Sequence, residues 1–497
     1  MGKKLPDQAM SRRAALAGMG ALGLGVLGAT TLGGCSPKSA DEAPAENAQA
    51  DVVVVGSGLA GMVAAVKAQE LGKTAVVVEK SEEVDFGGNS IIAGGTFIIP
   101  PTNDQEGIDI FVDDLMKQSS DRGNEALLRI AGERAWESIA WMEGVGAPFV
   151  EPTVTEPFRV MGTTPEPGSW SMPTALNALR DAFEANGGEI LFGTKMTKLV
   201  FDDAGKVIGI EARTGRGVTT VLGSCVILAT GGYAGNKGLL ELFIGPDADE
   251  MMVRGRSTAT GDGMMAAFAA GAGLCQVGGY EALHIAAVSP DDTASGNPSP
   301  GLPYMVAINA EGKRFVDESL GYVAHGKAVA VQPGTKDALI FDAAQAQQNP
   351  YVQYVIGLFQ EKGLPIHEAG SLAELAEMIE VPPAALEATI AEFNAHVSDD
   401  NAATGMAVDK ASHAYKMETA PYYALYPLVP GITLSFGGLL VDEKSRVLEP
   451  DGRSMPGLYA AGEVTGGLFV DDYIAGGSMI TSLVFALIAA ESAAEGA

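Results

Sequence analysis

The feature that most constrains the fold of this chain is a glycine-rich turn directly after a short apolar run. The run is Val52–Val55, the turn carries Gly56, Gly58 and Gly61, and a second apolar run ends in Glu79. In a strand–turn–helix–strand unit of this kind, the first glycine permits a tight turn. The second lets the backbone approach a pyrophosphate, and the third lets the helix pack close to the sheet. The helix N-terminus then faces the phosphates, and the acid can accept hydrogen bonds from a ribose. The unit therefore predicts a dinucleotide site.

The first 50 residues have a different character and are not expected to join this fold. Residues 1–35 contain Arg12-Arg13 and a glycine-rich apolar stretch to Leu32, a pattern typical of a twin-arginine export signal. The segment Leu32–Cys35 resembles a lipoprotein cleavage site with lipid on Cys35; an ordinary signal peptide or an uncleaved anchor is the alternative. Residues 36–50 are rich in Ala, Pro, Asp and Glu and are predicted to be a flexible linker. We expect an exported protein on the outer face of the cell membrane, touching the membrane only through this anchor.

Charge and cysteine content exclude several classes of function. A formal net charge of −30 argues against nucleic-acid partners and anionic lipid surfaces. The three cysteines include no CxxCH or CxxC pattern, so neither a c-type haem nor an iron–sulfur cluster is expected. Cys225 and Cys275 are expected to be free thiols, with a disulfide between them left open. His367, His396 and His413 lack metal-ligand spacing, so no metal site is predicted. We expect no segment after the leader to be long and apolar enough to span a membrane.

The mature chain is too long for one core and is expected to form two or three domains. Residues 51–281 and 434–497 share the texture of a nucleotide-binding domain, with buried strands that end in glycines. Residues 282–433 combine a Pro- and Gly-rich loop with amphipathic helix candidates, as an inserted cap would. The predicted class is α/β, namely a Rossmann-like domain in two parts that is interrupted by an α+β cap.

Six motifs, in order, make the chain resemble a known family over residues 51–497. It resembles the flavoprotein subunits of the succinate dehydrogenase/fumarate reductase superfamily, above all soluble flavocytochrome-c-type fumarate reductases and 3-ketosteroid dehydrogenases. The motifs are Gly56–Gly61, Gly87–Ser90 with Gly94-Gly95, Ala229–Gly232, Thr260–Gly263, Asn309–Glu318 and Gly457–Glu463.

The resemblance implies FAD as the cofactor, held without a covalent bond because Gly87–Ser90 contains no histidine. It also implies which residues would hold the cofactor. These are Gly56, Gly58, Leu59, Ala60, Gly61, Glu79, Lys80, Gly88, Asn89, Ser90, Gly94, Gly95, Ala229, Thr230, Gly231, Asp262, Glu463, Ser478 and Met479.

Departures from the fumarate reductase pattern concern the substrate. Tyr322 and Tyr473 stand where those enzymes have arginines, and Leu434 replaces a histidine. His284 keeps the family's histidine position, and the two positions of a proton relay read Pro298 and Gly301. Without guanidinium forks a dicarboxylate is a poor substrate.

Similarity to 3-ketosteroid dehydrogenases gives these tyrosines another role. It implies Tyr322, Tyr473 and the Gly477 N–H as catalytic groups on a ketone, with His284 and Leu434 at the substrate. Phenols of this kind polarise a carbonyl and move a proton.

Three functions follow as alternatives. The first is hydride transfer between flavin and the carbon–carbon bond next to a carbonyl, in a steroid-like or other cyclic ketone. The second is reduction of other unsaturated compounds such as aryl acrylates, with a quinol or cytochrome as electron donor; Arg159, His325 or Lys327 could then bind a carboxylate. The third is a flavin-carrying lipoprotein without catalysis. The small-molecule substrate itself is not identified.

Overall fold

The computed structural model describes residues 48–150, 153–155, 158–162, 172–246, 248–286, 296–470 and 472–496. The side chains of residues 153–155, 158–162 and 282–284 are outside this description. The predicted export signal, the lipid site at Cys35 and most of the linker also lie outside the described residues.

A six-stranded sheet forms the centre of the nucleotide-binding part, in the order β18-β19-β11-β2-β3-β7. All neighbouring pairs are parallel except β18 and β19. All four side chains of β2 are buried. A strand that is covered on both faces needs such an unbroken apolar run. The α/β class is thus confirmed. The strands are β2 (Val52–Val55), β3 (Ala75–Val78), β7 (Glu189–Leu191), β11 (Cys225–Leu228), β18 (Arg446–Leu448) and β19 (Ser454–Ala460).

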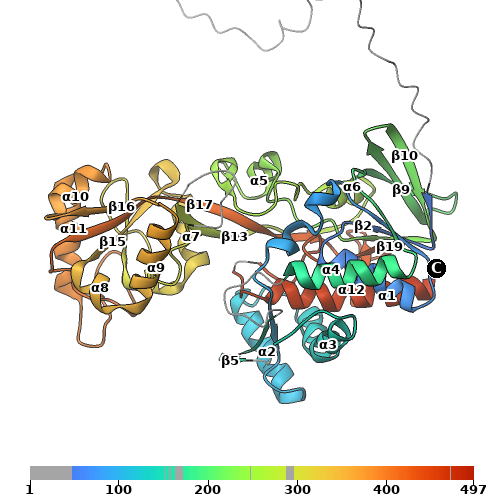
Figure 1. Cartoon of the computed structure of the whole chain (residues 1–497), viewed down its shortest axis with the longest axis horizontal. Helices are drawn as coiled ribbons and strands as arrows, with labels where there is room; N and C mark the ends of the chain where they lie inside the picture. The colour runs from blue at the N-terminus through green and yellow to red at the C-terminus, as the bar shows by residue number, and fades with distance from the viewer. Residues whose placement is uncertain are drawn as a thin grey trace, which may run out of the picture. The chain divides into compact units, whose positions relative to one another are not determined.

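Helices α1 (Leu59–Glu70) and α12 (Gly477–Gly496) pack against each other beside this sheet (Figure 1). By length and composition α12 could span a membrane, so the expectation that no such segment follows the leader was wrong. However, 72% of its most apolar window is buried in the protein. Burial against α1 and α3 (Glu125–Gly144) accounts for its apolar sequence, as in a core helix.

A second sheet pairs β8 (Lys195–Phe201), β9 (Val207–Thr214) and β10 (Gly217–Leu222) in antiparallel hairpins. Its edge is β1 (Ala48–Gln49), which pairs with β10 in parallel. The end of the predicted flexible linker is therefore ordered, because its backbone completes a sheet edge. A third sheet contains β4 (Thr96–Ile99), β5 (Thr153–Thr155) and β6 (Phe158–Gly162). The remaining helices of this part are α2 (Gln105–Gln118), α4 (Met172–Ala185), α5 (Lys237–Phe243) and α6 (Asp262–Ala269).

The fourth sheet belongs largely to the middle of the chain and is built on one long strand, β17 (Tyr422–Leu439). Its partners are β12 (Met252–Val253), β13 (Leu274–Ala286), β15 (Asp337–Asp342) and β16 (Ile366–Ala369), and β14 (Val306–Asn309) pairs with β15. Helices of the same segment are α7 (Tyr322–Ala330), α8 (Ala343–Gln348), α9 (Pro350–Glu361), α10 (Leu372–Met378) and α11 (Pro383–His396).

Strands β13 and β17 run side by side from the segment with α8–α11 to the part with α1 and α12 (Figure 1). The predicted boundaries at 281/282 and 433/434 both fall inside these strands, and the division stays a prediction. Buried apolar side chains nevertheless gather in separate clusters. One takes its members from residues 52–272 and 432–493, and the other two take theirs from residues 286–428.

Candidate active site

A cavity of about 770 Å³ opens between these elements, a size that suits a small-molecule or cofactor site. Nearly all the described residues predicted for the cofactor and substrate line it; the exceptions are Gly61 and Gly477, and the His284 side chain lies outside the description. Contributions come from the N-termini of α1 and α12, the ends of β3 and β11, residues 88–96, and Tyr322 at the start of α7. Residues from separate motifs of the sequence therefore face one continuous cavity.

The glycine turn at the α1 end of the cavity has no room for side chains. A Cβ on Gly56 would lie 2.3 Å from the Ala229 carbonyl oxygen, and the φ angle of Gly56 is +109°. A Cβ on Gly61 would lie 1.9 Å from the Gly56 carbonyl oxygen. Gly61 thus acts behind the cavity wall, by letting α1 pack directly on the turn. The turn leaves bare backbone facing the cavity, as a pyrophosphate group requires.

Glu79 holds this turn from the end of β3. Its Oε2 accepts hydrogen bonds from the Ser57 N–H at 3.0 Å and the Ser57 hydroxyl at 2.7 Å. Its Oε1 accepts the Ser81 N–H at 2.8 Å. The carboxylate is buried and also lines the cavity. It stabilises the turn, and its hydrogen bond to a ribose stays a prediction.

Lys80 and Asp262 form an ion pair in the same wall of the cavity. Lys80 Nζ lies 2.6 Å from Asp262 Oδ2, and Lys195 Nζ lies 3.0 Å from Asp262 Oδ1. Burial opposes ionisation of this carboxyl, but the hydrogen bond and charge of Lys80 outweigh burial and lower the pKa of Asp262. Asp262 is thus held ionised at the start of α6.

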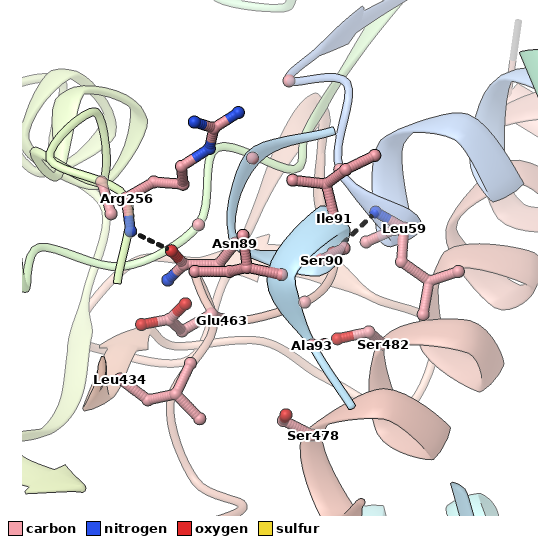
Figure 2. A pocket seen from close by; sticks show the side chains of 18 of the residues that line it. Leu59, Asn89, Ser90, Ile91, Ala93, Arg256, Leu434, Glu463, Ser478 and Ser482 are labelled. Atoms are coloured by element: carbon pink, nitrogen blue, oxygen red, sulfur yellow. Dashed lines mark hydrogen bonds between the residues drawn. The ribbon is translucent and has the colours of Figure 1, made fainter. Parts of the chain in front are cut away.

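Hydrogen bonds hold segment 88–90 in place from two sides (Figure 2). Ser90 Oγ accepts the Leu59 N–H at 3.0 Å, at the N-terminus of α1, and Asn89 Oδ1 accepts the Arg256 N–H at 2.7 Å. Glu463 lies near Asn89 and accepts the Ser435 N–H at 3.0 Å. Burial raises the pKa of Glu463, although hydrogen bonds from Ser435 and Asn89 oppose the shift.

Two tyrosines predicted from the sequence, Tyr322 and Tyr473, meet at the other end of the cavity. Burial, then the nearby Glu281 carboxyl, raises the pKa of Tyr322 well above its usual value, and the same causes raise the pKa of Tyr473 to about 12. The Tyr473 hydroxyl lies 3.0 Å from Ser478 Oγ and accepts the Gly476 N–H at 3.3 Å. Both phenols are therefore un-ionised at neutral pH.

Arg254 and Glu281 also line this end, and sequence reasoning missed both. Arg254 follows the short strand β12, and its Nη1 donates to Thr433 Oγ1 at 2.8 Å. Glu281 pairs with Leu434 across β13 and β17, whereas its neighbour Ala282 pairs with Ile432. Thr433 is therefore the extra residue of a β-bulge, and the bulge aims its hydroxyl at Arg254. An acid in the apolar strand before His284 was the one available sequence signal.

Residues 51–479 match the family described as FAD binding domain. The chain belongs to this family. Its cofactor is FAD, and the protein is an FAD-dependent oxidoreductase. A probable fumarate reductase of Shewanella frigidimarina is 28% identical over 466 residues, which are 92% of this chain and 76% of that protein.

Two solved structures have the same fold. The open conformation of a flavocytochrome c3 fumarate reductase matches with a TM-score of 0.72 and 27% identity, over 90% of this chain and 78% of that one. The 3-ketosteroid-Δ4-(5α)-dehydrogenase of Rhodococcus jostii RHA1 in complex with 4-androstene-3,17-dione gives 0.73 and 22%, over 92% and 99%. The second likeness concerns the fold alone.

The residues present fit an FAD molecule. Thr230 Oγ1 is buried beside the glycine turn, and none of the described residues gives it a hydrogen-bond partner. A buried hydroxyl of this kind needs a partner, which a phosphate or ribose oxygen would supply.

One prediction for the end of the cavity with the two tyrosines needs correction. The Gly477 N–H donates to the Ile474 carbonyl oxygen at 2.9 Å, so it is not available here for a ketone oxygen. Leu434 lines the cavity. The backbone of His284 pairs with Pro430, its side chain lies outside the description, and its role at the substrate stays a prediction.

Of the other cations considered for a carboxylate, His325 and Lys327 are not among the residues that line the cavity. His325 is fully buried with Nε2 2.9 Å from Asp337, and burial lowers the pKa of His325 to about 3. Lys327 Nζ lies 5.4 Å from the ring centre of Tyr280, and the Arg159 side chain is outside the description. Cys225 and Cys275 are free thiols, and the described residues contain no cluster of metal ligands.

Proposed function

We propose that this protein reduces a carbon–carbon double bond conjugated to a neutral carbonyl, as in a steroid-like or other cyclic enone. The observation that carries the proposal is the meeting of Tyr322 and Tyr473 at one end of the cavity, both un-ionised. The carboxyl groups of Glu281, Glu463 and Asp472 interact with this end, and their negative charge when ionised disfavours a dicarboxylate.

In this proposal the two phenols have different tasks. Bound FAD, once reduced, supplies a hydride to the carbon β to the carbonyl. Tyr473 donates a hydrogen bond to the carbonyl oxygen, because its own oxygen can accept from the Gly476 N–H and from Ser478, which leaves the phenolic hydrogen for the substrate. Tyr322 gives its proton to the α carbon. Residues 282–433 cover the site and exclude water.

A second candidate function is reduction of an unsaturated monocarboxylate such as an aryl acrylate. One observation favours it: Arg254 brings a guanidinium to the cavity, although the arginines of the fumarate reductase pattern are missing. A guanidinium can bind a carboxylate through two parallel hydrogen bonds. Against this, Arg254 already donates to Thr433 and interacts with Glu281.

An anaerobic reoxidation experiment separates these functions. Dithionite-reduced enzyme is mixed with a 3-keto-4-ene steroid, an aryl acrylate or fumarate, and flavin absorbance is followed. Fast reoxidation by the steroid alone is expected. Reoxidation by the acrylate alone would assign the carboxylate role to Arg254, and reoxidation by none of these compounds would favour an electron carrier.

The cellular setting is part of the proposal. The twin-arginine pattern and the lipoprotein site support export and attachment through Cys35. At that location a quinol or cytochrome would supply electrons.

A further inference from the structure

We propose that Glu281 is a positioning residue that returns a proton to Tyr322 after each turnover, with Arg254 balancing its charge. The inference rests on the proposed function, in which Tyr322 protonates the substrate. The relay positions of the fumarate reductase pattern read Pro298 and Gly301 in this chain, so a proton must reach Tyr322 by another route.

The bulge in the long strand pair brings these groups together. Arg254 follows β12 on one side of β17, and Glu281 lies on β13 on the other side. Between them the extra residue Thr433 accepts the Arg254 Nη1–H at 2.8 Å. Tyr322, at the start of α7, lines the same end of the cavity and interacts electrostatically with both Glu281 and Arg254. Three segments besides β13 thus come together around one buried carboxyl.

Burial and the surrounding charges bring the pKa of the Glu281 carboxyl close to neutral pH. Burial raises the pKa of Glu281 to about 7; Arg254 opposes the shift, and Glu463 and Asp472 add to it. The loop before α12 contributes Asp472 and Tyr473, and α7 contributes Tyr322, whose pKa Glu281 raises. On α7, Lys327 lies over the rings of Tyr280 and Phe436. A carboxyl of this kind gains and loses protons at physiological pH.

The proton balance closes without a further co-reactant. In the reductive step the Tyr322 O–H bond breaks and its proton joins the α carbon, while two electrons arrive with the hydride from reduced FAD. The phenolate then takes the proton of the Glu281 carboxylic acid, and the carboxylate recovers one from solvent. The return transfer is downhill, because the phenol has the higher pKa of the two groups.

A comparison of first and later turnovers tests this role. Glu281→Gln and Glu281→Asp are reduced with dithionite and mixed with whichever unsaturated acceptor the wild type accepts, from pH 5.5 to about 8.5. Tyr322 begins protonated, so Glu281→Gln should reoxidise at the wild-type rate in a single turnover. Its steady-state rate should fall ~10- to 100-fold and lose the pH dependence near neutrality. Glu281→Asp should restore part of the rate, and the exposed Glu361→Gln is the matched control.

Two results would overturn the inference. One is an unchanged steady-state pH profile in Glu281→Gln; the other is an equal loss in the first and later turnovers, as a purely structural role would give. If only a carboxylate acceptor reoxidises the wild type, the proposed substrate class is wrong, and the same comparison with that acceptor still decides the role of Glu281.

An infrared titration of the oxidised enzyme needs no substrate. It should show a protonated carboxyl that titrates near pH 7 and is missing in Glu281→Gln. Absence of this band in the wild type would also overturn the inference.

Discussion

At the scale of single residues, the end of the cavity lined by Tyr322 and Tyr473 combines un-ionised phenols with a carboxyl that titrates near neutral pH. Tyr473 is a buried phenol and Tyr322 a half-buried one, both with raised pKa values, and the Glu281 carboxyl beside them titrates near 7. A neutral donor costs little to bury when it is paired, whereas an unpaired charge costs much more. These side chains can therefore face an apolar substrate without a counter-ion from it.

Removing either phenolic hydroxyl should slow the reaction and leave the cofactor in place. Tyr322→Phe and Tyr473→Phe should each lower the reoxidation rate on the order of 10²-fold, through loss of a general acid or of a carbonyl hydrogen bond. FAD content, from flavin absorbance after gel filtration, should match wild type. Tyr354→Phe, at an exposed position, is the control. Near-normal rates in both variants would refute the mechanism.

Glu281 should also make stability depend on pH. Its pKa rises from 4.5 to about 7 on folding, so the folded state binds more protons between these values and the unfolding free energy falls as pH rises through them. Each pKa unit corresponds to about 1.4 kcal/mol, which gives a loss of up to about 3 kcal/mol above pH 7. Glu281→Gln should remove this loss, so its stability relative to wild type should be higher at pH 8 than at pH 5. Melting curves at both values measure this, and a pH-independent difference would contradict it.

At the scale of elements, the glycine turn and the segment before α7 fix the two ends of the site. The turn works by backbone proximity, since Gly56 and Gly61 leave no space for a Cβ. The segment before α7 depends on buried charge: Arg314 Nη2 lies 2.7 Å from Glu318 Oε2, and Lys410 Nζ lies 3.6 Å from the same oxygen. Glu318 also accepts the Ala307 N–H at 2.9 Å. This network ties the Asn309–Glu318 motif to the fold a few residues before Tyr322.

The close packing of the turn predicts a selective loss of cofactor. In Gly61→Ala the new methyl would lie 1.9 Å from the Gly56 carbonyl oxygen, so α1 must move. At about 1–3 kcal/mol of overpacking strain, FAD affinity should fall roughly 10- to 100-fold. Fluorescence titration of apoprotein with FAD measures this. Gly144→Ala, at a helix position with nothing near its Cβ, should bind normally; equal affinities would show that the packing is not needed.

Breaking the buried network should destabilise the segment that carries Tyr322. Arg314→Met leaves Glu318 buried with one cation fewer and should cost about 3–5 kcal/mol in unfolding free energy. Its exposed neighbour Lys313, paired with Glu311 on the surface, offers a control, and Lys313→Met should change little. Urea unfolding of both variants with FAD bound measures the difference, and similar midpoints would contradict the prediction.

The cofactor end was predictable because its signal is local. The glycine turn, Glu79, segment 88–95 and the end of β11 each carry their role in a few adjacent residues. Arg254 and Glu281 could not be predicted as site residues, because their proximity depends on a one-residue bulge between strands far apart in sequence. Gly477 was misassigned for a related reason: its spacing from Tyr473 is local, but the turn before α12 gives its N–H to Ile474.

At the scale of the whole molecule, the FAD-binding part and the predicted leader have different roles. The FAD-binding fold is built from residues 48 onward, and its last helix is apolar because it is buried. We therefore propose that membrane attachment depends on a lipid on Cys35 and not on α12.

This assignment predicts where the protein is found in cells. Cys35→Ser should move the protein from the membrane fraction to the soluble exported fraction, with its flavin retained. Replacing Arg12 and Arg13 by lysine should instead leave it inside the cell. Fractionation with antibody detection checks both variants, and membrane retention of Cys35→Ser would refute the lipid anchor.

The pairing of β13 with β17 has a consequence for how such proteins diversify. Ala282 and Ile432 are partners across these strands, so the predicted cap, residues 282–433, begins and ends at adjacent points. A single recombination event could replace that whole stretch and bring in a new residue at position 322. The glycine turn, Glu79 and α12 would be inherited unchanged. The range of substrates can then change by exchange of this stretch, while the residues that bind FAD stay the same.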